Sequence, residues 1–375
     1  MLFLKLGAIS FGGPAAHIAL IEAEVVGKRQ WITRQQFLDI LGAANLIPGP
    51  TSTETAINVG YVQAGWPGLC VAGASFIIPA ALITGAFAWA YVRFGRLPQA
   101  AAISAGIKPA VLAVIAIAIW RLGRTAVKDL GLAALGALAL AAFFFGLNVV
   151  AILFGGSLLG MLARRISKLH ATAMLAIAPF LRLPSPGTVF LFPSARIPPS
   201  LGRIALFFLK VGAVLYGGGY VLLAFLEQGL VRQHAWLTQQ QLLDAVAIGQ
   251  FTPGPVLSTA TFIGYILGGV RGAAVATLGI FLPSFFYVGL LAPVLFRLRK
   301  SVWIAAFLDS VNVCAVALMA GVTFRLGADA LRGWAAWLIA LLSFGILLRW
   351  KVSPAWVVLG GGVAGLLLAG ARGLW

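Results

Sequence analysis

The chain consists of two copies of one unit, and this internal duplication restricts its fold more than any other feature of the sequence. Residues 3–8 (FLKLGA) recur as residues 208–213 (FLKVGA), and a Pro-Gly-Pro segment at 48–50 recurs at 253–255. Between these landmarks the matched residues keep the same order, which chance does not produce. We therefore predict a first repeat at 1–165, a basic Pro-rich linker at 166–204 and a second repeat at 205–375.

Composition places both copies in a lipid bilayer. Of the 375 residues, 61% are hydrophobic and only 10% are charged, and the mean hydropathy is +1.01. Soluble domains carry about 25% charged residues, so a water-soluble enzyme is excluded. The formal net charge of +18 would suggest nucleic acid as a partner in a soluble chain. Here the basic residues fall mostly between apolar runs, as loop charges do in membrane proteins, and we expect no nucleic-acid partner.

Each copy contains apolar runs that approach or exceed the length needed to cross a bilayer, roughly 20 residues. The predicted fold is therefore an all-α polytopic membrane protein with about five transmembrane helices per repeat. The expected spans are 3–26, 67–92, 100–120, 130–145 and 149–162 in the first copy, and 205–231, 272–296, 302–324, 334–348 and 354–369 in the second.

A pair of shorter apolar segments, 35–46 and 51–62, lies between the first two spans of the first copy. Each is too short to cross alone, and Pro-Gly-Pro separates them. Two prolines around a glycine remove backbone donors and interrupt a helix. We interpret the segments as half-helices that meet inside the membrane, with the same arrangement in the second copy.

The basic residues test the orientation of the copies. If each half-helix pair re-enters and returns, most cations fall on one side of the membrane and the second copy is inverted. A model in which the Gly12-Gly13-Pro14 segment is also re-entrant gives the same charge balance with parallel copies. We favour inversion, because broken helices at the interface of inverted repeats recur in transporters. Both models place the linker in the cytoplasm.

The broken helices are the candidate substrate site. A helix that starts at the membrane midplane presents free N–H groups and a positive dipole end, which suit an anion. In the first copy this end reads Pro50-Thr51-Ser52-Thr53 and adds three hydroxyl groups, whereas in the second copy the hydroxyls come later. The first copy is therefore expected to bind an oxyanion better. The alternative is that Pro-Gly-Pro only ends a helix or allows close packing.

Three lysines and a few acids lie within the apolar runs. Charges in hydrocarbon are costly, so Lys5 and Lys210, at equivalent positions, are candidates to balance a substrate anion, and Lys108 is a third. Lys5 could instead reach the interface by snorkelling. A carboxyl group in low-dielectric surroundings can exist protonated and so carry a proton, with surface ion pairs as the alternative. The proton-coupling candidates are Glu22, Glu54 and Glu227.

Motifs for other functions are missing. The three histidines have no metal-ligand spacing, and the sequence has neither a nucleotide-binding phosphate loop nor a visible catalytic set. We therefore expect no metal, no cofactor and no enzymatic activity, which leaves secondary transport.

The N-terminal run at 3–17 (FLKLGAISFGGPAAH), the segment 48–54 (PGPTSTE) and their duplicates together resemble the chromate ion transporter family over essentially the whole chain. The resemblance implies export of chromate, a tetrahedral oxyanion, across a bacterial or archaeal inner membrane, driven by the proton gradient. The motif positions that it carries over are Gly12, Gly13, Pro14, Pro48, Gly49, Pro50, Gly217, Gly218, Pro253, Gly254 and Pro255. The second copy departs from the pattern, because Gly219 replaces the proline of its Gly-Gly element.

Three alternatives stay open at this point. The substrate could be sulfate or another oxyanion of similar shape and charge. The protein could instead be an anion channel or a membrane scaffold without coupling to a gradient. The sequence also leaves a homo-oligomer open.

Overall fold

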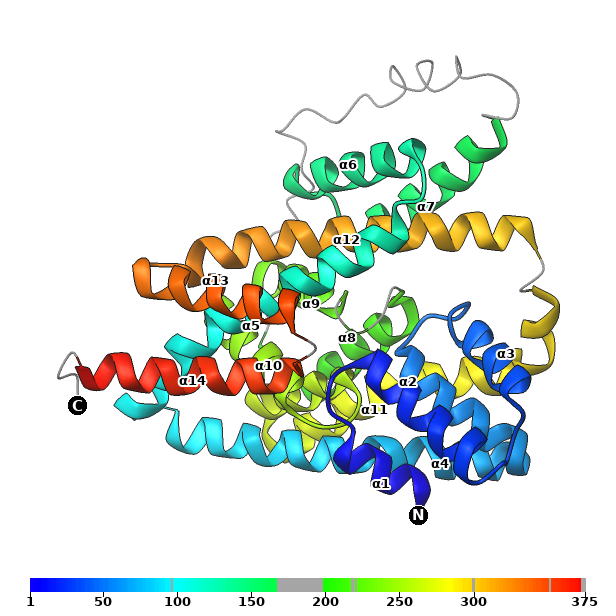
Figure 1. The fold of residues 1–375 in the computed structure, drawn as a ribbon, viewed down its shortest axis with the longest axis horizontal. Coiled ribbons are helices and arrows are strands. Elements are labelled where there is room, and N and C mark those ends of the chain that lie inside the picture. The colour runs from blue at the N-terminus through cyan, green and yellow to red at the C-terminus, as the bar shows by residue number, and fades with distance from the viewer. Residues whose placement is uncertain are drawn as a thin grey trace.

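The computed structural model describes residues 1–95, 97–166, 198–216, 219, 221–298, 301–350 and 352–371. Over these residues it is an all-helical molecule whose helices α4, α12 and α14 run along its long axis (Figure 1). The first repeat contains α1 (Leu2–Ile9), α2 (Pro14–Glu22), the π-helical turn η1 (Ala23–Lys28), α3 (Arg34–Ala44), α4 (Thr51–Phe94), α5 (Pro98–Ala126), α6 (Leu130–Phe144) and α7 (Val149–Ile166). The second repeat contains α8 (Leu201–Val214), α9 (Leu222–Leu226), η4 (Glu227–Gln233), α10 (Gln239–Phe251), η5 (Val256–Ser258), α11 (Thr259–Leu298), α12 (Val302–Ala330), α13 (Trp334–Arg349) and α14 (Pro354–Ala371).

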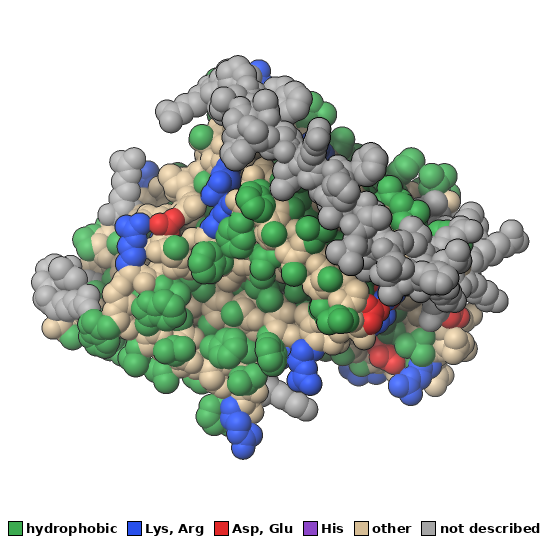
Figure 2. Space-filling model, turned by 90° about the horizontal axis from the view of Figure 1, so that it is seen from above, with side chains coloured by type: hydrophobic (Ala, Val, Ile, Leu, Met, Phe, Trp, Pro, Cys, Tyr) green, Lys and Arg blue, Asp and Glu red, His purple; other side chains and the backbone are tan. Residues whose placement is uncertain are grey.

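Five helices are long and apolar enough to cross a membrane within the described parts of the chain. They are Thr51–Phe94, Pro98–Ala126, Val256–Leu290, Trp303–Ala330 and Pro354–Ala371. Three shorter apolar helices, Leu130–Phe144, Val149–Arg164 and Trp334–Arg349, accompany them. The face drawn in Figure 2 is largely apolar with scattered basic side chains. Exposed tryptophans such as Trp89, Trp120 and Trp356 suit the interface between lipid and water.

The two longest helices are hairpins. Non-helical backbone at Ala64 and Gly65 divides α4, and Gly268 and Gly269 divide α11 in nearly the same conformation. A Cβ atom at Gly60 would lie 2.5 Å from the Ala72 Cβ, so the segments before and after the turn pack side by side. The Gln63 amide also donates to the Trp31 carbonyl (3.0 Å). The first half of α4 therefore returns to the level at which α3 begins.

The predicted spans 3–26 and 205–231 are wrong as continuous helices. In the first copy α1 ends at Ile9, because Gly12 and Gly13 adopt φ values of +106° and +79° and Pro14 lacks an N–H. The rings of Phe3 and Trp31 lie 6.5 Å apart, so α1 and the α2–η1 segment fold back on each other. In the second copy the rings of Phe207 and His234 lie 6.3 Å apart, which shows the same arrangement.

Equivalent helices of the two repeats run antiparallel where they touch. In the α4–α11 pair, a Cβ at Gly73 would meet the Phe285 ring and a Cβ at Gly289 would meet the Trp66 ring. In the α5–α12 pair, Lys128 at the end of α5 lies 2.6 Å from Asp309 near the start of α12. We call the end of the molecule at Trp31, Lys128 and Ile166 face 1, and the end at Leu97, Phe145 and Arg332 face 2.

The last two helices of each repeat pack on a helix of the other repeat. Helices α13 and α14 pack on α5, while α6 and α7 pack on α12. Two equivalent hydrogen bonds mark this exchange: the Arg121 guanidinium donates to the Leu347 carbonyl (3.1 Å), and that of Arg325 donates to the Phe143 carbonyl (3.2 Å). The main apolar core therefore contains residues of both copies.

Candidate functional site

The centre of the molecule is formed by the Pro-Gly-Pro segment of each repeat and the break after the first helix of the other repeat. The Gly49 N–H donates to the Leu215 carbonyl (2.7 Å), and the equivalent Gly254 N–H donates to the Ser10 carbonyl (2.8 Å). These reciprocal bonds join the breaks across the repeat interface. Because unsatisfied backbone groups are costly in a membrane, the pairing stabilises irregular backbone there.

Glycine is required at both centres of the Pro-Gly-Pro segments. Gly49 has a φ of +143° and Gly254 a φ of +88°, which side chains with a Cβ rarely adopt. A Cβ at Gly49 would also collide with the Glu54 carboxyl group and lie 2.6 Å from the Ser284 hydroxyl. At Gly254 it would lie 2.7 Å from the Ala80 Cβ. Glycine at both centres therefore allows the unusual backbone conformation and the close packing.

Polar side chains surround the break of the first copy. Ser52, Thr53 and Glu54 are buried in the first turn of α4. The ring of His17, buried on α2, lies 3.5 Å from the Ser52 hydroxyl through Nδ1 and 3.1 Å from the Ser10 carbonyl through Nε2. The Ser284 hydroxyl of α11 donates to Glu54 Oε1 (3.4 Å). Both repeats thus contribute to the surroundings of this helix end.

Several of these buried polar atoms lack partners. Among the residues that the structure describes, the buried side-chain atoms without a hydrogen bond include the Ser10 hydroxyl, the Thr53 hydroxyl and Glu54 Oε2 at this break, together with Glu227 Oε2 and the Ser353 hydroxyl. Buried polar groups in proteins are normally paired, and an orphaned one needs an explanation such as a ligand or water. In the equivalent region of the second copy, Thr84 of the first repeat donates to the Ser258 hydroxyl (3.1 Å) and Thr259 donates to the Val256 carbonyl (2.8 Å).

Comparison with known proteins assigns this arrangement to a family. The family model for chromate transporters matches residues 1–161 and 202–366. The chain belongs to the chromate transporter family. No solved structure matches it.

Two bacterial relatives with chromate in their names cover nearly the whole transporter. A probable chromate transport protein of Synechococcus elongatus is 34% identical over 352 residues, 93% of this chain and 88% of the relative. The chromate transport protein of Cupriavidus metallidurans is 34% identical over 371 residues, 98% and 92% of the two chains. An uncharacterized transporter of the archaeon Methanocaldococcus jannaschii is 29% identical over 98% of this chain and 93% of its own length. The protein is therefore a multi-pass membrane protein of a bacterial or archaeal type.

The predicted site residues of the transporter divide into three groups. The first lies at the centre and comprises Gly12, Gly13, Pro14, Pro48, Gly49, Pro50, Thr51, Ser52, Thr53, Glu54, Pro253, Gly254 and Pro255. The second, Gly217 and Gly218, falls outside the described residues. The third comprises Lys5, Lys210, Glu22 and Glu227, which the structure places elsewhere.

Lys5 and Lys210 are exposed and do not point to the centre. Lys5 interacts electrostatically with Glu24, and Lys210 with His234. Both lysines sit on the outer side of short helices whose opposite side is buried, so their placement does not support a role in balancing substrate charge.

Glu22 and Glu227 form ion pairs away from the centre. Glu22 lies 3.6 Å from Arg34. Glu227 is fully buried and contacts Arg232 (2.6 Å) and Arg325 (3.8 Å). These contacts favour a structural role for both acids.

Sequence reasoning missed four contributors to the centre of the transporter. Ser10 and His17 flank the Gly-Gly break and could have been found by their position. Ser284 and Tyr216 come from the other repeat, and the Tyr216 hydroxyl donates to the Leu46 carbonyl just before the first Pro-Gly-Pro segment (3.2 Å). Only the reciprocal packing of the copies brings these two residues to the site.

Proposed function

We propose that this protein is a secondary transporter that exports chromate or a closely related tetrahedral oxyanion, and that the anion binds at the central breaks. The observation that carries the proposal is the set of buried, unpaired polar atoms of Ser10, Thr53 and Glu54 beside a helix that begins in the interior. The names of the relatives support chromate as the substrate.

Neutral donors hold the anion in this proposal. The first N–H groups of a helix have no intrahelical acceptor, so those of Thr51 and Ser52 are available. Together with the hydroxyls of Ser10, Ser52 and Thr53 they form a donor set at a positive helix end, which binds tetrahedral anions in many proteins. Lys5 and Lys210 are left out, because both are exposed away from the centre.

Glu54 is the residue to which we assign proton coupling. Its side chain is fully buried, and it interacts electrostatically with the phenol of Tyr216, which in turn interacts with that of Tyr287. A carboxyl group with one hydroxyl donor and one unpaired oxygen can alternate between protonated and ionised forms as the anion enters or leaves. Glu54→Gln removes that alternation while keeping the shape.

The repeats are inverted in the membrane in this proposal. The antiparallel packing of α4 on α11 and of α5 on α12 supports it, because a two-fold axis perpendicular to membrane-spanning helices lies in the membrane plane. Positions 128 and 332 are equivalent in the two copies. Cysteines placed there in a chain lacking Cys70 should react with an impermeant reagent from opposite sides, whereas parallel repeats would expose both on the same side.

Transport into inverted membrane vesicles tests the function. We expect uptake of chromate that depends on the proton gradient in the wild type, loss of that dependence in Glu54→Gln, and slower uptake in Ser52→Ala. Excess sulfate that abolishes chromate uptake would favour sulfate as the substrate. Uptake that is unaffected by collapsing the proton gradient would favour a channel. Wild-type rates in both variants would contradict the assignment of the central site.

A further inference from the structure

A cavity of about 530 Å³ enters the molecule from face 2. It is lined by residues of α5 and α10, including Ala105 and Gln240, and by residues of α13 and α14. Arg332 lies at its mouth, and Lys108 lies on the stretch of α5 farthest from face 2. The cavity therefore extends along α5 and α10 toward the interior.

The same two helices continue from the cavity to the central breaks. Asp244 follows the cavity residue Leu243 on α10, and the side chains of Val246 and Gln250 come next. These two line a much smaller pocket with Ile115 of α5 and with Gly219 and Val256, which belong to the breaks of the second repeat. A path from the mouth of the cavity to these breaks therefore passes Lys108 and Asp244 before it reaches the smaller pocket.

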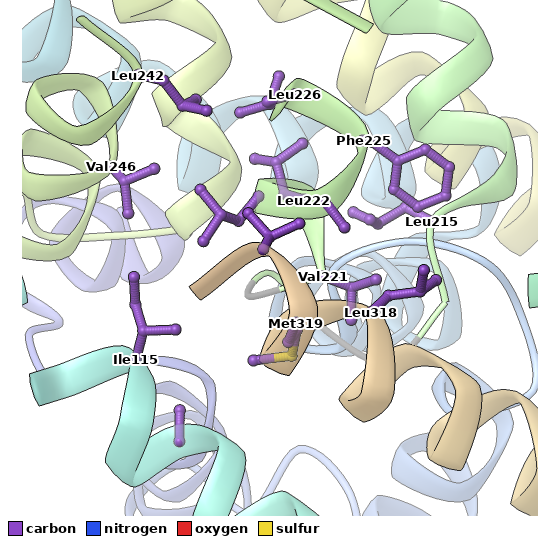
Figure 3. Close-up of a cluster of buried hydrophobic side chains, with 14 of the residues drawn as sticks. Ile115, Leu215, Val221, Leu222, Phe225, Leu226, Leu242, Val246, Leu318 and Met319 are labelled. Carbon is purple, nitrogen blue, oxygen red and sulfur yellow. The ribbon is translucent and has the colours of Figure 1, made fainter. Parts of the chain in front are cut away.

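A cluster of apolar side chains blocks the path between the cavity and the breaks in this structure. Figure 3 shows Ile115 of α5, Val246 of α10, Leu222 and Leu226 of α9 and Met319 of α12 packed in one cluster. The small pocket has a volume of only about 10 Å³, which is too little for an oxyanion. Lys108 and Asp244 therefore stand at the inner end of an open cavity, just above a closed apolar segment.

The ion pair at that position is arranged so that the lysine can leave it. The Lys108 ammonium lies 3.5 Å from Asp244 Oδ1, and the two side chains are 16% and 10% exposed. Asp244 also accepts hydrogen bonds from the Tyr91 hydroxyl (2.9 Å) and the Ser104 hydroxyl (2.5 Å). With these two donors the carboxylate stays satisfied if the ammonium turns to another anion, which avoids the cost of a buried unpaired charge.

We propose that this cavity is the passage between face 2 and the central site, and that Lys108 is the residue that binds the oxyanion at its inner end. The inference rests on the proposed oxyanion transport and adds a second binding position to it. The ammonium exchanges Asp244 for the entering or leaving oxyanion. The second repeat has Asn312 of α12 at the position equivalent to Lys108, so this basic residue occurs in one copy of the repeat.

Chromate transport measured from each side tests the proposal. Initial rates in right-side-out and inverted vesicles give a KM for chromate at each face. Lys108→Gln should raise the KM at face 2 by about tenfold, the effect of losing one charge-assisted contact, and leave the KM at face 1 within about twofold. Lys108→Arg should restore most of the affinity.

Arg332→Gln is the matched control, because Arg332 is also basic and lines the same cavity, but its side chain is 79% exposed and pairs with Asp329. Its KM at face 2 should change by less than about twofold, since exposed charges are screened. An unchanged KM in Lys108→Gln, or an equal rise at both faces, would overturn the proposal. A wild type that carries no oxyanion would overturn the proposed function itself and this inference with it.

A second measurement keeps the test independent of the folding of Lys108→Gln. Ala105→Cys, in a chain lacking Cys70, places a thiol in the cavity wall. An impermeant anionic thiol reagent should modify it from face 2 only, and chromate should slow the reaction. Modification that is insensitive to chromate, or that occurs from face 1, would contradict the passage.

Discussion

The two repeats share one pattern of helices but differ in how their half-helices are packed. In the second repeat, α10 lies against α5 and α14, whereas its counterpart α3 packs mainly on α4 and α11. Asp244 of α10 has three partners in α4 and α5, while the equivalent Asp39 accepts from Gln35 of its own helix (3.3 Å). The comparison teaches that equivalent sequences can be held in two environments within one molecule.

The polar groups follow the same division. At the second-copy break the Ser258 hydroxyl is paired with Thr84 of the first repeat, whereas Ser10 and Thr53 at the first-copy break are unpaired. An internally satisfied break is a structural element, whereas one with free donors can take a ligand. The predictions that follow compare pairs of residues in the two environments, so that each outcome shows whether this division is real.

The largest difference is expected between Glu227→Ala and Glu22→Ala. Glu227 is fully buried beside Arg325, so its removal leaves a largely buried cation and should cost about 3–5 kcal/mol. Glu22 is 35% exposed and its pair with Arg34 is loose (3.6 Å), so its loss should cost about 1 kcal/mol or less. Thermal unfolding in detergent measures both values. Equal losses would mean that the acids have equivalent environments.

Asp244→Asn and Asp39→Asn should differ by a smaller amount. The amide at 244 removes the charge next to the half-buried Lys108 and disturbs two hydroxyl donors, for a loss of about 2 kcal/mol. The change at 39 should cost less, because Asp39 is only half-buried and its hydrogen bond with Gln35 is exposed. Denaturation curves in the same detergent compare the two variants. A larger loss of stability at position 39 would contradict the conclusion that α10 is held by more contacts than α3.

Ser52→Ala and Ser258→Ala separate transport from stability. Ser52 is adjacent to the unpaired donors, and its removal should slow chromate transport by about tenfold, equivalent to 1.4 kcal/mol. Ser258 is paired with Thr84, so its removal should leave the rate within about twofold. The readout is the initial rate in vesicles at equal protein. Equal rates in the two variants would place the anion outside the first-copy break.

Thr53→Val and Thr84→Val are expected to have small effects of opposite sign on stability. Thr53 has a buried hydroxyl without a partner, so a methyl group there should be neutral or stabilise by up to about 1 kcal/mol. Thr84 donates to Ser258, so its replacement should destabilise by about 1 kcal/mol. Differential scanning fluorimetry can resolve the two, and destabilisation by Thr53→Val would show that its hydroxyl is satisfied.

The sequence predicts the features that depend on neighbouring residues. The duplication, the long apolar helices and the interruption at Pro-Gly-Pro all follow from local chemistry, and the described helices end at Ala44 and begin again at Thr51 around that segment. The favoured sequence model includes the Gly12-Gly13 break in a span, because the surrounding residues are apolar, whereas the alternative with a re-entrant Gly12-Gly13-Pro14 segment anticipates it.

Tertiary placement was beyond the sequence. Lys5 and Lys210 lie in apolar runs, yet whether a helical side chain faces the centre or the outside depends on which side of a short helix packs. The contact of Gly49 with Leu215 joins residues of different copies, and no local pattern indicates it. The same holds for Ser284 beside Glu54.

The exchange of helix pairs between the repeats also sets an order of folding. Helix α5 is synthesised early, but the helices that cover it, α13 and α14, are among the last to leave the ribosome. The core of the first repeat therefore cannot be completed until α13 and α14 have been synthesised. Contacts of such long sequence separation form slowly. Removal of α14 should consequently leave α5 without a main packing partner and destabilise the N-terminal half, far in sequence from the missing residues.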